Sequence, residues 1–418
     1  MTFLSIRALR LRDWLLENKR ELLVALALAI VCAIAIEIGK GGWHGPETYK
    51  IYLVGDQGNP EINAVYKPFL DLAAHIRLEI NGVPVEVKVK NDLGSPKTAV
   101  EIAKELRDQP DTLLIIGSVR TQETKEALPY YMDAIPQIPV ITTTESDDDL
   151  LGSCLDCDEQ EYVPLLQLSP TNRIQAESAI RYAKERGRKR FLLVSEENSQ
   201  NPSYSTNLVS DFRTAIQTYA GQGLILVGEV HMGQPPTLES LKLAKPDCVL
   251  YAGESGTAHA LADALADYRK DPGVHAEMTL ILSDASVMPG LKDDSMNEFK
   301  SVFYTFASDA AFYRRNVNVF GEDAFAIVSQ LLATDDGTSE DLMERLRKFV
   351  GMRRVGDARK DIIRRMKRNI LVGSAYTGES GERYQFVGYQ RQGALFHVWS
   401  VEDGKVADVD GWHAQRTE

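Results

Sequence analysis

The sequence predicts an α/β protein of two lobes, each built on a parallel β-sheet with helices on both faces, behind one apolar N-terminal segment. Three observations carry this prediction. From residue 48 on, short apolar runs alternate with helical patterns, which is the order that βα units produce. The alternation forms two series separated by an acidic segment, and 418 residues leave room for two domains. An uninterrupted apolar run follows a basic N-terminus.

The apolar segment predicts a membrane anchor. Residues 22–36 are continuously apolar, and the run reaches residue 38 if Glu37 is accepted. A bilayer span takes about 20 residues and at least about 17, so a transmembrane helix over 22–38 is short but usable. A cleaved signal peptide is the alternative, because Ala33-Ile34-Ala35 has the small-x-small pattern of a cleavage site. A buried core helix is a third interpretation.

Both membrane interpretations place the rest of the chain outside the cytoplasm. Five basic residues lie in the 1–21 tail, and the positive-inside bias keeps such a tail cytoplasmic. The glycine-rich residues 39–48 read as a tether. We therefore expect a signal-anchor or exported protein at the cell membrane whose main domain is periplasmic or extracellular.

The first βα series predicts strands over 49–54, 83–90, 112–116 and 139–142, and helices over 60–80, 96–106 and 121–134. Residues 83–90 alternate strictly between apolar and polar side chains, as a half-exposed strand does. Pro96 suits the first turn of a helix, and Thr121 is an expected helix cap.

The second series predicts strands over 190–194, 224–230, 248–251 and 280–283, and helices over 173–185, 204–219, 238–244 and 257–268. Two such series indicate parallel sheets covered on both faces. Late in the chain, 385–390 and 395–401 read as strands joined by 391–394, which predicts a closing hairpin.

These elements predict how the chain divides into domains. Lobe 1 covers 49–168 with part of 300–418 returning to it, lobe 2 covers 169–300, and 301–418 holds a hinge return, a basic helical tract and the closing hairpin.

Composition and motifs exclude several function classes. A net charge of −13 argues against a general nucleic-acid binder. P-loop, HExxH and GxSxG motifs are absent, and the seven histidines form no recognisable catalytic or metal-binding pattern. We therefore expect that the protein is not an enzyme and has no catalytic residues, bound metal or cofactor. Cys154 and Cys157 lack a second ligand pair, so they read as a local disulfide or two idle thiols. Cys32 and Cys248 read as buried small hydrophobes.

Two charged tracts interrupt the pattern. Residues 145–161 carry eight acidic side chains without calcium-loop spacing, which predicts a solvated loop. Residues 345–368 carry eleven basic side chains, with Ile362, Ile363 and Met366 on one face of a possible helix. That helix could simply be solvated on its basic face, or it could rest on anionic lipid or a partner.

Short signatures in this order resemble the type I periplasmic solute-binding proteins, and among them the branched-chain amino-acid receptors of ABC transporters. They are YLVGDQGN, NDLGSPKTAVEIAKEL, LLIIGSVRTQET, IPVITTTESD, FLLVSEENSQNPSYSTNLVSDF, CVLYAGESG, LILSDAS and GERYQFVGYQ. The resemblance covers about Lys50 to Trp412. It implies two Rossmann-like lobes joined by a hinge, which close on a small polar ligand such as an amino acid.

The resemblance also implies ligand-binding residues: Ser118, Thr121, Thr142, Thr144, Ser146, Tyr204, Glu254 and Asp284. Hydroxyls would hold a carboxylate, the two acids an ammonium, and Tyr204 would cover the ligand. Four of them have a plainer interpretation: Thr121 as a helix cap, Tyr204 as a core or rim aromatic, and the two acids as exposed loop residues.

Departures from the family leave the ligand and the function open. Glu145 replaces a small residue, Ala285 stands where relatives have glutamate, and Arg120 adds a charge. The extra acid favours a cationic or more polar ligand, or a cleft that no longer binds one. The expected partner is an ABC permease or a membrane signalling protein, and the alternative function is an anchored sensor or scaffold ectodomain that recognises a protein.

Overall fold

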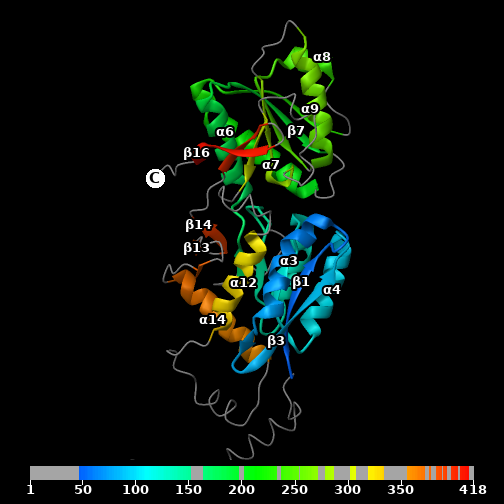
Figure 1. The fold of residues 1–418 in the computed structure, drawn as a ribbon, viewed down its shortest axis with the longest axis vertical. Coiled ribbons are helices and arrows are strands. Elements are labelled where there is room, and N and C mark those ends of the chain that lie inside the picture. The colour runs from blue at the N-terminus through cyan, green and yellow to red at the C-terminus, as the bar shows by residue number, and fades with distance from the viewer. Residues whose placement is uncertain are drawn as a thin grey trace, which may run out of the picture. The chain divides into compact units, whose positions relative to one another are not determined.

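A computed structural model describes residues 47–151, 163–196, 202–232, 237–253, 255–271, 278–286, 302–306, 319–333, 355–371, 376–377, 383–387, 389–392, 397–402 and 405–413 (Figure 1). The described elements belong to one compact unit, Thr48–Asp336 with Val355–Glu418. They are organised around two β-sheets, which confirms the α/β class.

The nine-stranded sheet has the order β12-β13-β14-β6-β5-β4-β1-β3-β2. Its strands are β1 (Tyr49–Gly55), β2 (Glu79–Ile80), β3 (Val83–Asn91), β4 (Thr112–Gly117), β5 (Val140–Thr142), β6 (Leu165–Gln167), β12 (Tyr376–Thr377), β13 (Arg383–Val387) and β14 (Gln390–Gln392). The five neighbours from β6 to β3 run parallel, so their carboxyl ends share one edge.

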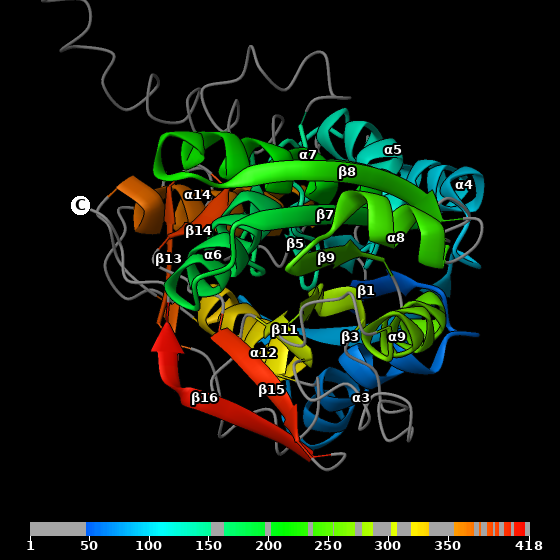
Figure 2. The same ribbon diagram turned by 90° about the horizontal axis from the view of Figure 1, so that it is seen from above.

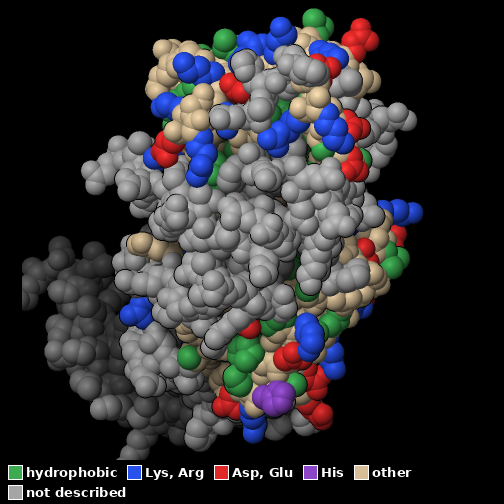
Figure 3. Space-filling view, turned by 45° about the horizontal axis from the view of Figure 1, so that its top comes forward, with side chains coloured by type: hydrophobic (Ala, Val, Ile, Leu, Met, Phe, Trp, Pro, Cys, Tyr) green, Lys and Arg blue, Asp and Glu red, His purple; other side chains and the backbone are tan. Residues whose placement is uncertain are grey.

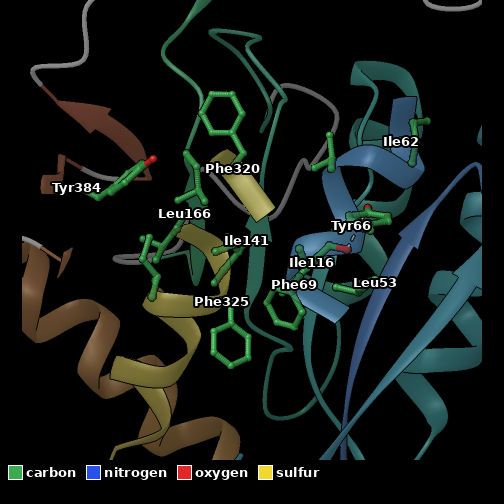
Figure 4. Close-up of a cluster of buried hydrophobic side chains, with 14 of the residues drawn as sticks. Leu53, Ile62, Tyr66, Phe69, Ile116, Ile141, Leu166, Phe320, Phe325 and Tyr384 are labelled. Carbon is green, nitrogen blue, oxygen red and sulfur yellow. Dashed lines mark hydrogen bonds between the residues drawn. The ribbon is translucent and has the colours of Figure 1, made fainter. Parts of the chain in front are cut away.

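Helices cover both faces of this sheet. Helices α3 (Pro60–His75), α12 (Val319–Leu332) and α14 (Val355–Leu371) pack on one face, and α4 (Pro96–Asp108) and α5 (Thr121–Met132) on the other. The strand period of two divides β1, because Leu53 joins the first core and Val54 the second. Figure 4 shows the first core, where Leu53 lies near Phe69 of α3.

The seven-stranded sheet has the order β16-β15-β11-β10-β9-β7-β8. Its strands are β7 (Arg190–Glu196), β8 (Ile225–Met232), β9 (Cys248–Ala252), β10 (Thr279–Leu282), β11 (Val302–Phe306), β15 (His397–Glu402) and β16 (Lys405–His413). Helices α6 (Asn172–Glu185) and α7 (Pro202–Thr218) pack on one face, and α8 (Leu238–Ala244) and α9 (Ser255–Arg269) on the other (Figure 2). Cys248 is fully buried, as expected.

The described elements pass between the two sheets three times: from β6 to α6, from β11 to α12, and from β14 to β15. The third passage contradicts the predicted closing hairpin. Strand β14 pairs antiparallel with β13, with Gln390 opposite Val387, whereas β15 pairs with β11 and β16 in the other sheet. We expect the predicted hinge at these three passages.

The helix predicted over 60–80 is too long. Helix α3 ends at His75, and Glu79–Ile80 forms β2, which pairs antiparallel with β3. Asn81 and Gly82 adopt positive φ angles of 52° and 71° between these strands. Asn-Gly is the sequence that best tolerates such a two-residue turn, so local turn chemistry ends the helical pattern.

Helix α14 uses the apolar side of the basic tract within the fold. Ile362 and Met366 are fully buried in the core, and Ile363 is half-buried. Their side chains are therefore not a free apolar face for lipid. Arg359 is also buried, and it donates hydrogen bonds from Nε to Thr112 O (2.7 Å) and from Nη1 to Pro136 O (3.2 Å). Burial lowers the pKa of Arg359 to about 10.

Replacing Arg359 by alanine should lower the free energy of unfolding by about 2 kcal/mol, because two carbonyl groups lose their donor and a buried stem is removed. Urea unfolding measures this change. The adjacent Lys360 is exposed, so Lys360→Ala should stay within about 0.5 kcal/mol of the wild type. Equal losses in the two variants would contradict the role of Arg359.

No helix within the described ranges is long and apolar enough to cross a bilayer. The anchor predicted over 22–38 lies outside those ranges, as do Cys32, Cys154 and Cys157. On the described part of one face, Lys and Arg side chains are interspersed with Asp and Glu (Figure 3), which is typical of a solvated surface.

Candidate functional site

The strand order of the nine-stranded sheet identifies where a ligand would bind. The chain goes from β1 to β3 on one side and then to β4 on the other side of β1, so the order reverses between β1 and β4. In open α/β sheets ligands bind outside the carboxyl ends of the strands at such a reversal. Asp56 follows β1 there, and Ser118 and Thr121 follow β4. Two of the predicted site residues therefore stand at this point.

Thr121 does not cap α5, which corrects the sequence prediction. Arg120 is the N-cap residue and makes no side-chain capping hydrogen bond, while Thr121 is the first residue of the helix. The Thr121 hydroxyl instead donates to Glu145 Oε1 at 3.1 Å. Ser118 is buried beside Asp92, where its hydroxyl helps to lower the Asp92 pKa against the larger raising effect of burial.

The loop after β5 brings the next predicted hydroxyls to the same edge. Thr144 Oγ1 donates to Val119 O (3.2 Å), and Ser146 Oγ donates to Asn172 Oδ1 (2.7 Å). The hydroxyls of Thr142 and Thr143 are buried and have no hydrogen-bond partner within the described residues. These two side chains are thus free to accept or donate to a bound molecule.

Glu145 is buried, not solvated as the acidic tract suggested. Its side chain, with those of Ser146 and Asp147, is at most 3% exposed. Glu145 Oε1 accepts from Thr121 Oγ1 and from Asp147 N (2.8 Å), whereas Oε2 has no partner within the described residues. Burial raises the pKa of Glu145 to about 8, and the nearby charge of Asp147 acts in the same direction.

A second cluster lies on the seven-stranded sheet. Asp284 begins a short 3₁₀ turn after β10 (η2, Asp284–Ser286), and its Oδ1 accepts from Gln175 Nε2 (2.9 Å), from Ala285 N (3.0 Å) and from the Tyr204 hydroxyl. Oδ2 receives none of these hydrogen bonds. Burial raises the pKa of Asp284, although the donors oppose that shift. Two of the predicted site residues, Tyr204 and Asp284, are therefore brought together.

The first turns of α6 connect the two clusters. Asn172 accepts from Ser146 of the first cluster, and Gln175, one turn later, donates to Asp284 of the second. The N-terminus of α6 is already occupied by an anion, because Arg173 N donates to Asp148 Oδ2 at 3.0 Å. Asn207 of α7 also donates to Asp147. Polar contacts thus join the carboxyl ends of both sheets.

The sequence prediction missed Asn172, Gln175 and the burial of Glu145. The only signal was the polar density of TNRIQAES at the start of α6, which also fits an exposed helix face. Glu254, which was predicted to face the ligand, lies outside the described residues. Among the described residues, no group of three or more His, Cys, Asp and Glu side chains could hold a metal ion.

Comparisons with known proteins identify the family and agree with the two-sheet fold. Residues 62–330, more than half of the chain, match the family described as periplasmic binding protein. Among solved structures, a substrate-binding protein of an ABC transporter from Desulfitobacterium hafniense in complex with Leu is similar at a TM-score of 0.60 and 14% identity, over 87% of this chain and 100% of that one.

Two further structures show the same fold at similarly low identity. A leucine-binding protein from Thermotoga maritima has a TM-score of 0.59 and 15% identity, over 86% of this chain and 97% of that chain. A solute-binding protein from R. palustris in complex with 4-hydroxybenzoate has a TM-score of 0.62 and 14% identity, over 89% and 98%. No curated protein matches the sequence.

Proposed function

The chain belongs to the periplasmic binding proteins and has their type I fold, and from this premise we propose that it is an extracytoplasmic receptor for a small polar solute, an amino acid or a related compound. The family consists of binding proteins rather than enzymes. The proposed ligand site lies at the carboxyl ends of the two sheets, and binding is reversible without bond chemistry.

The arrangement of Asp284 carries the amino-acid proposal. Three donors hold its Oδ1 in place, from Tyr204, Gln175 and the backbone of Ala285, and leave Oδ2 for a ligand ammonium. Charge-assisted hydrogen bonds of this kind are about twice as strong as neutral ones. The buried hydroxyl of Thr142, which has no hydrogen-bond partner within the described residues, supplies a complementary donor for a carboxylate.

The neighbouring structures support a role in ABC-type uptake. Those named above include a substrate-binding protein of an ABC transporter, bound to Leu, and a solute-binding protein bound to 4-hydroxybenzoate. Capture for transport would bring the receptor to a permease at the membrane. The N-terminal anchor over 22–38 would keep it there, and this anchor stays a prediction from the sequence.

Asp284→Asn should weaken amino-acid binding at least about tenfold, because the ammonium loses its charged acceptor. Calorimetric titration with the solutes that stabilise the wild type in a thermal-shift screen measures this loss. A true ligand should add about 2.7 kcal/mol of stability at a hundredfold excess over its dissociation constant.

Asp267→Asn is the matched control, since Asp267 is exposed and pairs with Lys270, three residues further along the same chain segment. It should leave the affinity unchanged. A screen in which no small solute stabilises the protein, while a protein partner is captured, would overturn the receptor proposal in favour of a scaffold ectodomain.

A further inference from the structure

Buried acids outnumber buried bases at the carboxyl edge of the nine-stranded sheet. Asp92, Glu123, Glu145 and Asp147 follow the strands β3, β4 and β5, and each is at most 3% exposed. Two basic side chains are buried in the described part of this edge, Arg120 (9% exposed) and Arg391 of β14 (7% exposed), and Arg391 donates to Leu168 O directly after β6. Because burial penalises charge, such an edge calls for additional positive charge or for protons.

Three of the four acids have cations close by. Asp147 pairs with Lys125 Nζ at 2.9 Å. Arg120 lowers the pKa of both Asp92 and Glu123, although burial raises both pKa values more strongly. Among the described residues, no basic side chain acts on the pKa of Glu145 in the same way. Glu145 is therefore the acid at this edge whose charge is not balanced.

The geometry of Glu145 leaves one oxygen for a ligand. Thr121 and the backbone of Asp147 fix Oε1, so the carboxyl group is oriented, while buried Oε2 has no donor within the described residues. An unsatisfied buried acceptor costs about 1–3 kcal/mol, which a ligand N–H would recover. The hydroxyls of Thr142 and Thr143, which have no partner within the described residues, lie three and two residues before Glu145 on the same strand and loop.

We propose that Glu145 forms a second cation subsite, which selects ligands that carry a positively charged nitrogen besides the α-ammonium. Basic amino acids have this chemistry, and diamines likewise carry two cationic nitrogens. A ligand with an anionic side chain would be repelled by several carboxyl groups. A ligand with a neutral side chain would leave Oε2 of Glu145 without a hydrogen-bond donor. This inference rests on the proposed function, in which Asp284 holds the α-ammonium.

Binding of such a ligand should be coupled to a proton. Free Glu145 has a pKa of about 8, and a bound cation favours its ionised form, so binding below pH 8 releases a proton. Affinity for the cationic ligand should then rise with pH, by at most about tenfold per pH unit. Asp147, Lys125 and Asp211 of α7 face the same loop, and Asp211 has a pKa raised to about 7, so Asp211→Asn separates its contribution.

Calorimetric titration of the wild type, Glu145→Gln and Glu126→Gln with L-lysine, L-ornithine, 1,4-diaminobutane, L-leucine and L-glutamate tests the inference. The wild type should prefer the cationic solutes over leucine by at least about tenfold, and Glu145→Gln should lose that preference while its leucine affinity changes little. Glu126 is exposed on α5, so Glu126→Gln should behave as the wild type.

A second measurement does not depend on the variant folding. Titrating lysine into the wild type in two buffers of different ionisation enthalpy should show release of up to one proton below about pH 8. If leucine binds as well as lysine and no proton is released, the inference fails and the receptor proposal stands. If no solute of the panel binds, both fail.

Discussion

Replacing Gly321 by alanine should lower the free energy of unfolding by about 3 kcal/mol or more, because α12 crosses α3 at this residue without room for a side chain. A Cβ at Gly321 would lie 2.0 Å from the carbonyl oxygen of Val65 and 3.7 Å from the ring of Pro68. The obstacle is helix backbone, which cannot rotate away as a flexible side chain can. The two helices must therefore move apart to accept even a methyl group.

That movement would also disturb the next turn of both helices. Phe69 and Phe325 follow Val65 and Gly321 by four residues, and their rings meet edge to face with centroids 5.3 Å apart (Figure 4). Such a pair adds about 0.5–1.5 kcal/mol to the free energy of its buried area. Losing both the close crossing and this contact explains why the expected effect exceeds that of an ordinary surface substitution.

Urea unfolding at equilibrium measures the change, with Gly221→Ala as the matched control. Gly221 lies in a short 3₁₀ turn (η1, Ala220–Gln222), where an added Cβ meets no atom within 4 Å. Gly221→Ala should stay within about 0.5 kcal/mol of the wild type. Similar stabilities for the two variants would show that α12 and α3 tolerate separation.

The βα units could be predicted because their signals are local. Apolar runs such as 112–116 mark a strand buried on both faces, and the apolar face of 173–185 marks a helix that packs on one side. Helix α12 gives a weaker signal, because it is buried on nearly all sides and only a narrow face of its sequence is polar, formed by Glu322, Asp323, Ser329 and Gln330. Strand β6 has only three residues and follows the acidic tract, so its pattern is too short to detect.

Family signatures indicated some of the candidate site residues. The sequence could not indicate those whose burial depends on contacts with residues far away in the chain. The signatures named Tyr204 and Asp284 separately, and the structure brings their side chains into hydrogen-bond contact. Glu145 stands in a run of acids whose composition predicts a solvated loop. Its burial depends on Thr121 from α5, and Gln167 of β6 also binds its backbone oxygen (3.1 Å), neither of which is its neighbour in sequence.

The ligand-free wild type should lose stability as pH rises from about 5 to about 8, and Glu145→Gln should not show the same loss. Burial raises the pKa of Glu145 from 4.5 to about 8 in the folded state. Between these values the folded protein binds more protons than the unfolded chain, so raising the pH favours unfolding. Glu145 thus contributes its full stability below about pH 4.5, and this is lost as the pH passes through 8, with a slope of up to about 1.4 kcal/mol per pH unit.

Urea unfolding of both proteins at about pH 5, 6.5 and 8 separates Glu145 from the other acids whose pKa values are raised, since Asp211 and Asp284 titrate in both. At pH 5 the two stabilities should agree within about 1 kcal/mol, because glutamine resembles the protonated acid. At pH 8 Glu145→Gln should be more stable by about 3 kcal/mol. If stability depends on pH in the same way in both proteins, Glu145 is ionised at neutral pH in the folded wild type.

A Glu145→Gln variant that is more stable at pH 8 and has lost its preference for lysine would instead show a trade-off between stability and binding. The unsatisfied carboxyl group of Glu145 would then serve ligand binding, because binding sites often retain groups that destabilise the empty protein.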